Sequence, residues 1–251
     1  MSDGYRTLVL QSHRRPLPGR WLERCLASVR DWAEQQGHHY RFEDDALFER
    51  LAPDLRERTR AQKVIAADLA RLAALQAALE EGFDTVVWLD ADTLVLRPAA
   101  LVLPDEPYAL GREVWVQRNA DGLRSYVKVH NAFLMFRRGN PFLDFYRHAA
   151  ERIVRAHRGP MVPQLVGPKL LTALHNLIDC PVLEQAAMLS PAVAHDVLGG
   201  GGAALDAFRA RSAAAPAAVN LCASLVGREI DEAQILALID RLLRDPDVLR
   251  P

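Results

Sequence analysis

The stretch that decides the fold is Phe83–Pro98, which reads FDTVVWLDADTLVLRP. Its apolar run without alternation predicts a strand buried on both faces, and the run ends in Asp90 and Asp92 with the small Ala91 between them. Side chains alternate along an extended backbone, so both carboxylates project to one side, at the sheet edge where α/β proteins bind ligands. This predicts a site for Mg²⁺ or Mn²⁺ bridging a diphosphate, or simply a polar turn that caps a core strand.

The composition is that of a globular protein. Of 251 residues, 50% are hydrophobic and 25% charged, and 31 Lys and Arg nearly balance 32 Asp and Glu to give a formal net charge of −1. This balance provides no field that attracts nucleic acid, which is therefore not an expected partner. Cys25, Cys180 and Cys222 lack CxxC spacing and are odd in number. They argue against a zinc site and a disulfide framework and favour a reducing, cytoplasmic location.

No apolar run is long enough for a signal peptide or a membrane span. We therefore expect a protein without a transmembrane segment, for which peripheral membrane contact stays open.

Outward from the acidic pair, the chain alternates predicted strands and helices. Strands are expected at residues 5–10, 39–42, 86–89 and 130–137, with weaker candidates at 181–183 and 217–221. Helices are expected at 21–36, 60–81, 141–157 and 231–243, and a short one opens at Gly167 and Pro168. The glycine- and alanine-rich region 199–215 is predicted to be a mobile loop, whose glycines could hinge a lid. With no repeat and no linker, we expect one α/β domain.

The predicted helix at 60–81 carries an apolar stripe, and Asp68 projects into the same sector. A buried carboxylate needs a partner, and Arg71, three residues on, is the nearest candidate. Asp68 and Arg71 could form a pair that joins this helix to a neighbour. Alternatively they could line a cleft, because the helix leads directly into the strand that bears Asp90 and Asp92.

Five blocks between residues 16 and 174 resemble, in their order and spacing, the GT-A-fold glycosyltransferases with a DxD sugar-binding region, and the resemblance covers roughly residues 8–172. Within that fold they resemble the group of capsular-polysaccharide and initiating mannosyltransferases. The blocks read PLPGRWLERCLASVRDWAEQQGHHYRFEDD, AQKVIAADLARLAAL, VVWLDADTLVLRP, HNAFLMFRRGNPFLDFY and VGPKLLTAL. The resemblance implies a GT-A-like, Rossmann-type mixed sheet flanked by helices in a single domain over residues 1–251. Its donor-binding half would span about 1–100 and its acceptor-side half about 101–251.

The resemblance also implies residue roles for the metal site. Asp90 and Asp92 would hold Mn²⁺ or Mg²⁺ together with the donor's diphosphate and sugar. The late histidine that commonly supplies the third metal ligand has no clear counterpart, and Asn220 is our substitute, since an amide offers a carbonyl oxygen. A second departure is that Glu81–Asp84 replaces the usual Gly-Gly-Tyr-type turn.

For the donor sugar, the resemblance implies that Asp68 and Arg71 line the pocket and that Asn131 faces the transferred sugar. Gly167 and Pro168 match a turn near the acceptor side. His130, next to Asn131, is either an acceptor contact or a packed strand-end histidine.

Several further side chains are candidates for the nucleotide and the acceptor. Gln11, Ser12 and His13, at the carboxyl edge of the first strand, are placed for base or ribose contacts. Lys169 and Arg228 could be additional diphosphate cations or solvated surface charges. Trp115 and Tyr126 could stack on a sugar, whereas Trp115 also fits a core position.

The expected reaction is metal-dependent glycosyl transfer from a nucleoside-diphosphate sugar to a hydroxyl of a carbohydrate or other acceptor. A UDP-sugar is favoured as donor, with GDP-mannose second. No acid after Asp92 stands out as a carboxylate base, and the resemblance points to retention of configuration. One alternative is a noncatalytic sugar-nucleotide binder of the same fold. The other is a haloacid-dehalogenase-type phosphatase, although Thr93 and Leu94 do not match that motif.

Overall fold

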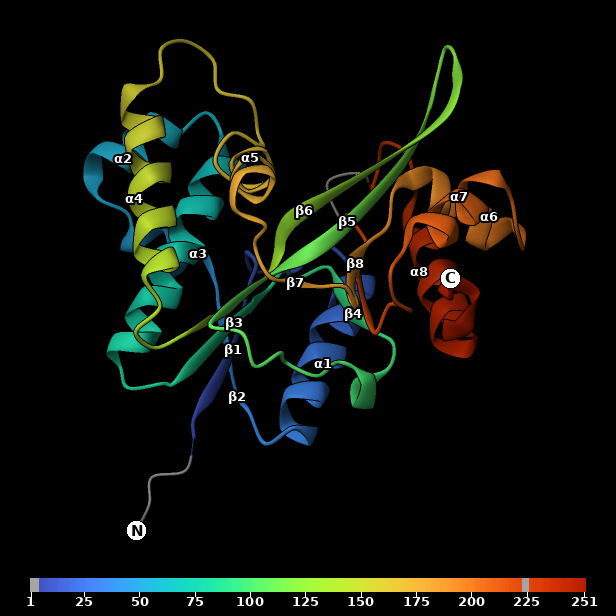
Figure 1. Cartoon of the computed structure of the whole chain (residues 1–251), viewed down its shortest axis with the longest axis horizontal. Helices are drawn as coiled ribbons and strands as arrows, with labels where there is room; N and C mark the ends of the chain where they lie inside the picture. The colour runs from blue at the N-terminus through green and yellow to red at the C-terminus, as the bar shows by residue number, and fades with distance from the viewer. Residues whose placement is uncertain (1–4, 223–225) are drawn as a thin grey trace.

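The apolar run before Asp90 forms an inner strand of the main sheet. The computed structural model describes residues 5–222 and 226–251 (Figure 1). The sheet has the order β2-β1-β3-β6-β5-β7, with β1 parallel to β2 and β3, β6 antiparallel to β3 and β5, and β7 parallel to β5. Its strands are β1 (Thr7–Ser12), β2 (His39–Glu43), β3 (Thr85–Leu89), β5 (Tyr108–Asn119), β6 (Gly122–Arg137) and β7 (Val182–Leu183).

A small second sheet continues from the acidic pair. It has the order β4-β9-β8 and consists of β4 (Thr93–Val95), β8 (Ala186–Met188) and β9 (Ala218–Asn220). Thr93 pairs with Asn220 in this sheet. The chain therefore brings residue 220 beside the segment that follows β3.

Helices cover both sides of the main sheet (Figure 1). On one side lie α2 (Pro53–Thr59), α3 (Lys63–Glu80), α4 (Pro141–Ala156) and α5 (Pro168–Ile178); on the other lie α1 (Arg20–Gln35), α6 (Pro191–Gly199), α7 (Ala203–Arg211) and α8 (Glu232–Arg244). Three 3₁₀ helices complete the described chain: η1 (Asp45–Arg50), η2 (Pro98–Ala100) and η4 (Pro246–Leu249). Within the described ranges, no helix is both long and apolar enough to cross a membrane.

The predicted mixed α/β architecture, a central sheet flanked by helices, is confirmed. The predicted strands and helices are present with shifted boundaries; the helix expected at 60–81 is α3, and α2 precedes it outside the predicted range. The division into donor-binding and acceptor-side halves stays a prediction.

The predicted loop at 199–215 is wrong over α7. Gly200 ends α6 in the left-handed conformation, with φ of 85°. Asp196 then reaches across the glycines and accepts hydrogen bonds from the backbone nitrogens of Ala204 and Leu205, at 2.7 and 3.0 Å. Because these nitrogens have no partner within their own helix, the carboxylate stabilises its start. The glycines therefore join two helices.

The β5–β6 hairpin is the main feature that the sequence did not predict, since only residues 130–137 were expected to form a strand. Its two strands have 12 and 16 residues and extend beyond the body of the protein (Figure 1). At the base of the hairpin, the pairing register shifts between Leu110 and Gly111. This irregularity leaves space for the ring of His130, the partner of Gly111.

His130 is a packed histidine, one of the two alternatives for this residue. Its side chain is 1% exposed; Nε2 lies 3.1 Å from the carbonyl oxygen of Ala186, and Nδ1 accepts from the backbone nitrogen of Ala132 at 3.0 Å. The ring therefore carries its hydrogen on Nε2. It packs so closely on Gly111 that an added Cβ there would lie 2.2 to 2.8 Å from three ring atoms.

We expect Gly111→Ala to destabilise the protein by about 1–3 kcal/mol, because the added methyl group overlaps a fully packed ring. Urea denaturation measures the change. The matched control is Gly199→Ala, since a Cβ there meets no atom within 4 Å. Equal unfolding midpoints for Gly111→Ala and wild type would contradict this account of the hairpin base.

Candidate functional site

Arg71 is the centre of the predicted site. It lies on α3 with only 6% of its surface exposed. Its Nη1 donates to the carbonyl oxygen of Asn131 at 2.7 Å and lies 2.9 Å from Asp90 Oδ1, and its Nη2 lies 3.1 Å from Asp68 Oδ1. The guanidinium thus connects α3, the end of β3 and β6. The structure brings together Asp68, Arg71, Asn131 and Asp90, and their roles at a donor sugar stay a prediction.

Asp90 is held from several directions. Its Oδ1 accepts a hydrogen bond from Trp88 Nε1 at 2.7 Å in addition to the ion pair with Arg71. Its carbonyl oxygen accepts from Gln11 Nε2 at 3.1 Å, and Tyr40 donates to Gln11 Oε1 at 3.1 Å. The Asp90 side chain is nevertheless 28% exposed. One carboxylate oxygen is therefore fixed, and the group as a whole remains accessible.

Asp92, which is partly buried, is oriented by β9. Asn220 Nδ2 donates to Asp92 Oδ1 at 2.6 Å, and Asn220 Oδ1 accepts from the backbone nitrogen of Cys222 at 2.9 Å. Both ends of the Asn220 amide are thus engaged, which makes it an orienting group for Asp92. Its role as a third metal ligand stays a prediction.

The donor set fits a hard divalent cation only in part. Within residues 5–222 and 226–251, no group of three or more His, Cys, Asp or Glu side chains is arranged to hold a metal ion. Asp90 and Asp92 are the acidic pair that the site offers, and Mg²⁺ is commonly held by one or two carboxylates plus water and substrate phosphates. The residues therefore fit a cation whose coordination is completed by the substrate.

The carboxylate of Asp68 is buried and only partly satisfied. Its Oδ1 accepts from Asn131 Nδ2 at 2.7 Å, whereas its buried Oδ2 has no hydrogen-bond partner. Gly167, just before α5, covers both groups so closely that a Cβ there would lie 2.6 Å from Asp68 Oδ2 and 2.7 Å from Asn131 Nδ2. Tyr146 donates to the carbonyl oxygen of Val166 at 2.8 Å and holds this segment in place. Only glycine fits this approach.

Burial shifts two pKa values at the site. Burial raises the pKa of Asp68 to about 6, although Arg71 and the hydrogen bond from Asn131 lower it. Burial also lowers the pKa of His130 to about 4, so that this histidine is neutral at pH 7. A carboxyl group whose pKa is raised in the folded state lowers the stability as the pH rises from its unfolded to its folded pKa. A histidine whose pKa is lowered in the folded state lowers the stability as the pH falls from its unfolded to its folded pKa. The two groups therefore affect stability with opposite signs over nearly the same pH range.

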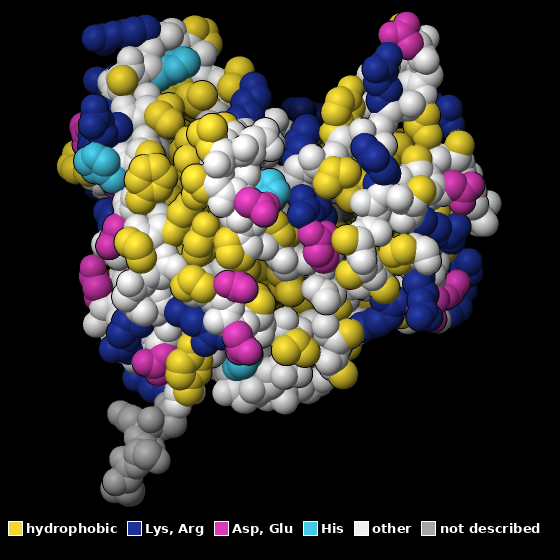
Figure 2. Space-filling model, viewed as in Figure 1, with side chains coloured by type: hydrophobic (Ala, Val, Ile, Leu, Met, Phe, Trp, Pro, Cys, Tyr) yellow, Lys and Arg dark blue, Asp and Glu magenta, His cyan; other side chains and the backbone are white. Residues whose placement is uncertain are grey.

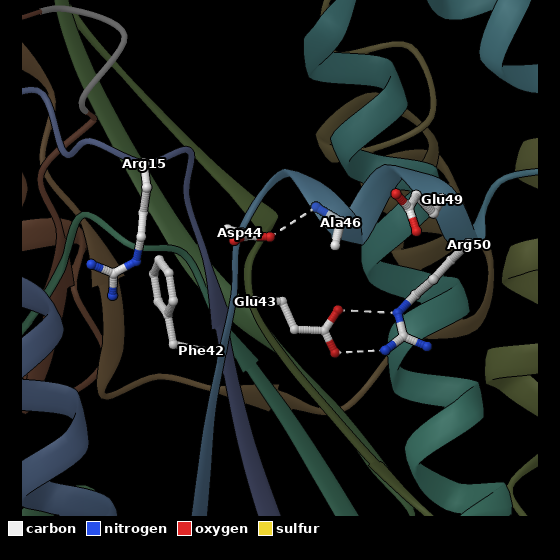
Figure 3. A pocket seen from close by; sticks show the side chains of 7 residues that line it. All are labelled: Arg15, Phe42, Glu43, Asp44, Ala46, Glu49 and Arg50. Carbon is white, nitrogen blue, oxygen red and sulfur yellow. Dashed lines mark hydrogen bonds and ion pairs between the residues drawn. The ribbon is translucent and has the colours of Figure 1, made fainter.

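The predicted nucleotide contacts lie beside a hollow at the ends of β1 and β2. Gln11 is buried and held as described above, and Ser12 and His13 are partly buried at the end of β1. The hollow has a volume of about 800 Å³. Figure 3 shows its lining: Arg15, Phe42, Glu43, Asp44, Ala46, Glu49 and Arg50.

Two contacts shape this hollow. The guanidinium of Arg15 lies 4.7 Å from the centre of the Phe42 ring. Arg50 donates to both carboxylate oxygens of Glu43, at 3.0 and 2.7 Å. Figure 3 shows the Arg15–Phe42 stack on one side of β2 and the Glu43–Arg50 pair on the other.

Lys169 and Arg228 are both exposed. Their role at a diphosphate stays a prediction.

Glu113 is a charged residue near the site that the sequence did not single out. It is 8% exposed, and Lys128 Nζ lies 3.9 Å from its Oε1. The pKa of the Cys222 thiol is raised by burial and further by the negative charges of Asp92, Glu113 and Asp90. In the sequence, Glu113 is one charged residue in a segment where polar and apolar residues alternate. Only its pairing with Lys128 in the structure distinguishes it from the other charged residues of that segment.

We expect Asp68→Asn to change the pH dependence of stability, because an amide does not ionise. Ionisation of Asp68 lowers wild-type stability as the pH rises from about 3.8 through about 6, and this penalty is of the order of 2–3 kcal/mol at neutral pH. The stability of the variant relative to wild type should therefore increase with pH. Denaturation at several pH values measures this difference, to which His130 contributes equally in both proteins. A difference independent of pH would contradict the raised pKa.

Known proteins support the fold but not a family assignment. No known protein family and no curated protein matches the sequence. A glycosyltransferase involved in the glycosylation of the major capsid of PBCV-1 is 11% identical, with a TM-score of 0.52 over 93% of this chain and 98% of that chain. Mouse xyloside xylosyltransferase 1 is 12% identical, with a TM-score of 0.46 over 88% and 98%. The chain thus has a GT-A-like glycosyltransferase fold.

Proposed function

We propose that the protein is a metal-dependent glycosyltransferase that moves a sugar from a nucleoside-diphosphate sugar to a hydroxyl acceptor. The observation that carries this proposal is the pair of carboxylates after β3, each oriented by a separate group: Asp90 by Arg71 and Asp92 by Asn220. Fixed carboxylates at the carboxyl edge of a sheet suit an ion and a charged ligand. The fold of the viral glycosyltransferase agrees with this reaction class.

The charges at the site favour a cation. With Asp68 ionised, Asp68, Asp90 and Asp92 provide three negative charges around the single positive charge of Arg71, so the group has a net negative charge. Asp90 and Asp92 would hold Mn²⁺ or Mg²⁺ and, through it, the donor diphosphate. When bound, the ion supplies Lewis-acid stabilisation of the departing diphosphate.

The residues around Arg71 form the proposed sugar pocket. Asn131 Nδ2 donates to Asp68 Oδ1 at 2.7 Å, and we assign both side chains to this pocket. Arg71 keeps both carboxylates in position. Lys169 and Arg228 are proposed as further diphosphate contacts from the exposed rim.

The hollow between Arg15 and Arg50 is the proposed base site, next to Gln11, Ser12 and His13. The Arg15–Phe42 stack offers a flat surface for a base. A UDP-sugar is the first choice and GDP-mannose the second. The three cysteines are unpaired, and a cytoplasmic location stays a prediction from them.

We propose that configuration is retained, with the leaving diphosphate oxygen receiving the proton of the acceptor hydroxyl. The bond between the anomeric carbon and the diphosphate breaks as the bond to the acceptor oxygen forms, on the same face of the sugar.

A thermal-shift panel of UDP-sugars and GDP-mannose, each with and without Mn²⁺, tests the donor. We expect a higher melting temperature with one donor plus Mn²⁺, and loss of this shift in Asp92→Asn, because binding only to the native state stabilises it. The control is Asp105→Asn, because the Asp105 carboxylate is fully exposed and its ion pair with Arg137 Nη2 has a distance of 3.9 Å. Equal shifts in Asp92→Asn and wild type would contradict the cation site.

Turnover separates an enzyme from a binder of the same fold. Slow release of free sugar from the bound donor is expected, with the anomer that forms first identified by NMR. A donor-dependent shift without any release would favour the noncatalytic alternative, and hydrolysis of a simple phosphate monoester would favour the phosphatase. First formation of the opposite anomer would contradict retention.

A further inference from the structure

The two faces of the β5–β6 hairpin differ in chemistry. Val114 pairs with Val127 and Val116 with Ser125, so these residues share one face. Val114 and Val116 are buried in an apolar cluster with residues of α6 and α7 such as Val193 and Phe208. This face therefore fixes the hairpin to the body of the protein.

The opposite face carries aromatic and charged side chains. Glu113 pairs with Lys128, and Trp115 pairs with Tyr126, so these four residues form what we call the aromatic face. Lys128 Nζ lies 5.2 Å from the centre of the Tyr126 ring and 3.9 Å from Glu113 Oε1. Trp115 Nε1 donates to Gln117 Oε1 at 3.1 Å. The aromatic face is thus preorganised by contacts between its own members.

This face is accessible in the described structure. Tyr126 is 37% exposed, and the side chain of Lys128 is 40% exposed. In Figure 2 the hairpin stands apart from the opposite lobe of helices, with a hollow between them. A ligand can therefore approach the hairpin from outside.

The aromatic face leads down to the proposed donor site. The next pair below Glu113 and Lys128 on the same face is Gly111 with His130, and Asn131 of the sugar pocket follows directly. A molecule lying on this face would have one end close to the donor sugar.

We propose that the aromatic face binds the acceptor, and that this acceptor is a carbohydrate; the inference deepens the proposed transferase function and rests on it. Tyr126 and Trp115 stack against the apolar faces of sugar rings. Aromatic side chains with a polar atom at the ring edge are suited to this contact. Lys128 donates to the oxygens of sugar hydroxyls, and the buried Glu113 carboxylate orients its ammonium group. Because the pair is neutral overall, it favours a neutral ligand rich in hydroxyls.

The length of the hairpin adds to the argument. Asn119 lies eight positions after Gly111, so at about 3.4 Å per residue the hairpin extends roughly 25 Å beyond Gly111. A single small hydroxyl compound does not need such a surface, whereas an oligosaccharide uses it along its length.

Binding of the wild-type protein to a panel of immobilised oligosaccharides tests the proposal. We expect at least one to be bound, and we expect Tyr126→Ala and Lys128→Ala to weaken that binding about tenfold. Tyr126→Phe should retain it, since the ring is kept. The matched control is Val127→Ala, which removes an exposed side chain from the opposite face of the same strand and should leave binding unchanged.

Donor measurements distinguish this proposal from the transferase function. Tyr126→Ala should keep the thermal shift with donor and Mn²⁺ and the release of sugar to water, while transfer to the bound oligosaccharide falls. A further outcome is that wild type binds an oligosaccharide that Tyr126→Ala does not bind, yet responds to no donor. That result would support carbohydrate binding by the aromatic face and contradict the transferase function. If no oligosaccharide binds, or if the alanine variants bind as well as wild type, the acceptor proposal is overturned.

Discussion

The site depends on one buried positive charge, the guanidinium of Arg71. Arg71 is almost fully buried, and a buried charge is tolerated only where counter-charges and hydrogen bonds compensate the loss of water. Asp68, Asp90 and the carbonyl oxygen of Asn131 provide this compensation from α3, β3 and β6. A lysine lacks the planar set of five donors needed to reach all three groups at once. The guanidinium therefore fixes the relative positions of three elements as well as those of their side chains.

Arg71 also explains why the two carboxylates after β3 are not equivalent. Asp90 shares its Oδ1 between Arg71 and Trp88, so its position is set from the core side. Asp92 is set from the opposite direction by Asn220 on β9, a residue 128 positions away in the chain. An ion between them would meet ligands that are already oriented. Such preorganisation reduces the reorganisation that binding and catalysis require.

The sequence predicted the parts of this site that follow from local periodicity. The position of Asp68 among the apolar residues of α3 indicated its burial, and the apolar run of β3 indicated where Asp90 and Asp92 would lie. Periodicity could not identify Glu113, because its burial depends on pairing with Lys128 across a hairpin whose register shifts at Gly111. It also failed at α7, whose start is stabilised by Asp196 from beyond four glycines. Both failures involve side-chain contacts across a turn, which no window of neighbouring residues contains.

The hairpin shows how a long projection can remain ordered. An isolated pair of strands is marginally stable in water, and it needs an apolar face packed against another element. Val114 and Val116 provide that face, and the two hydrogen bonds from Arg112 Nε and Nη2 to Glu184 Oε1, at 3.0 and 2.6 Å, add an anchor near the base. The requirements of folding are thereby met on one side of the strands. The opposite side is free to carry Trp115 and Tyr126, residues that contribute little to the core and are available for recognition.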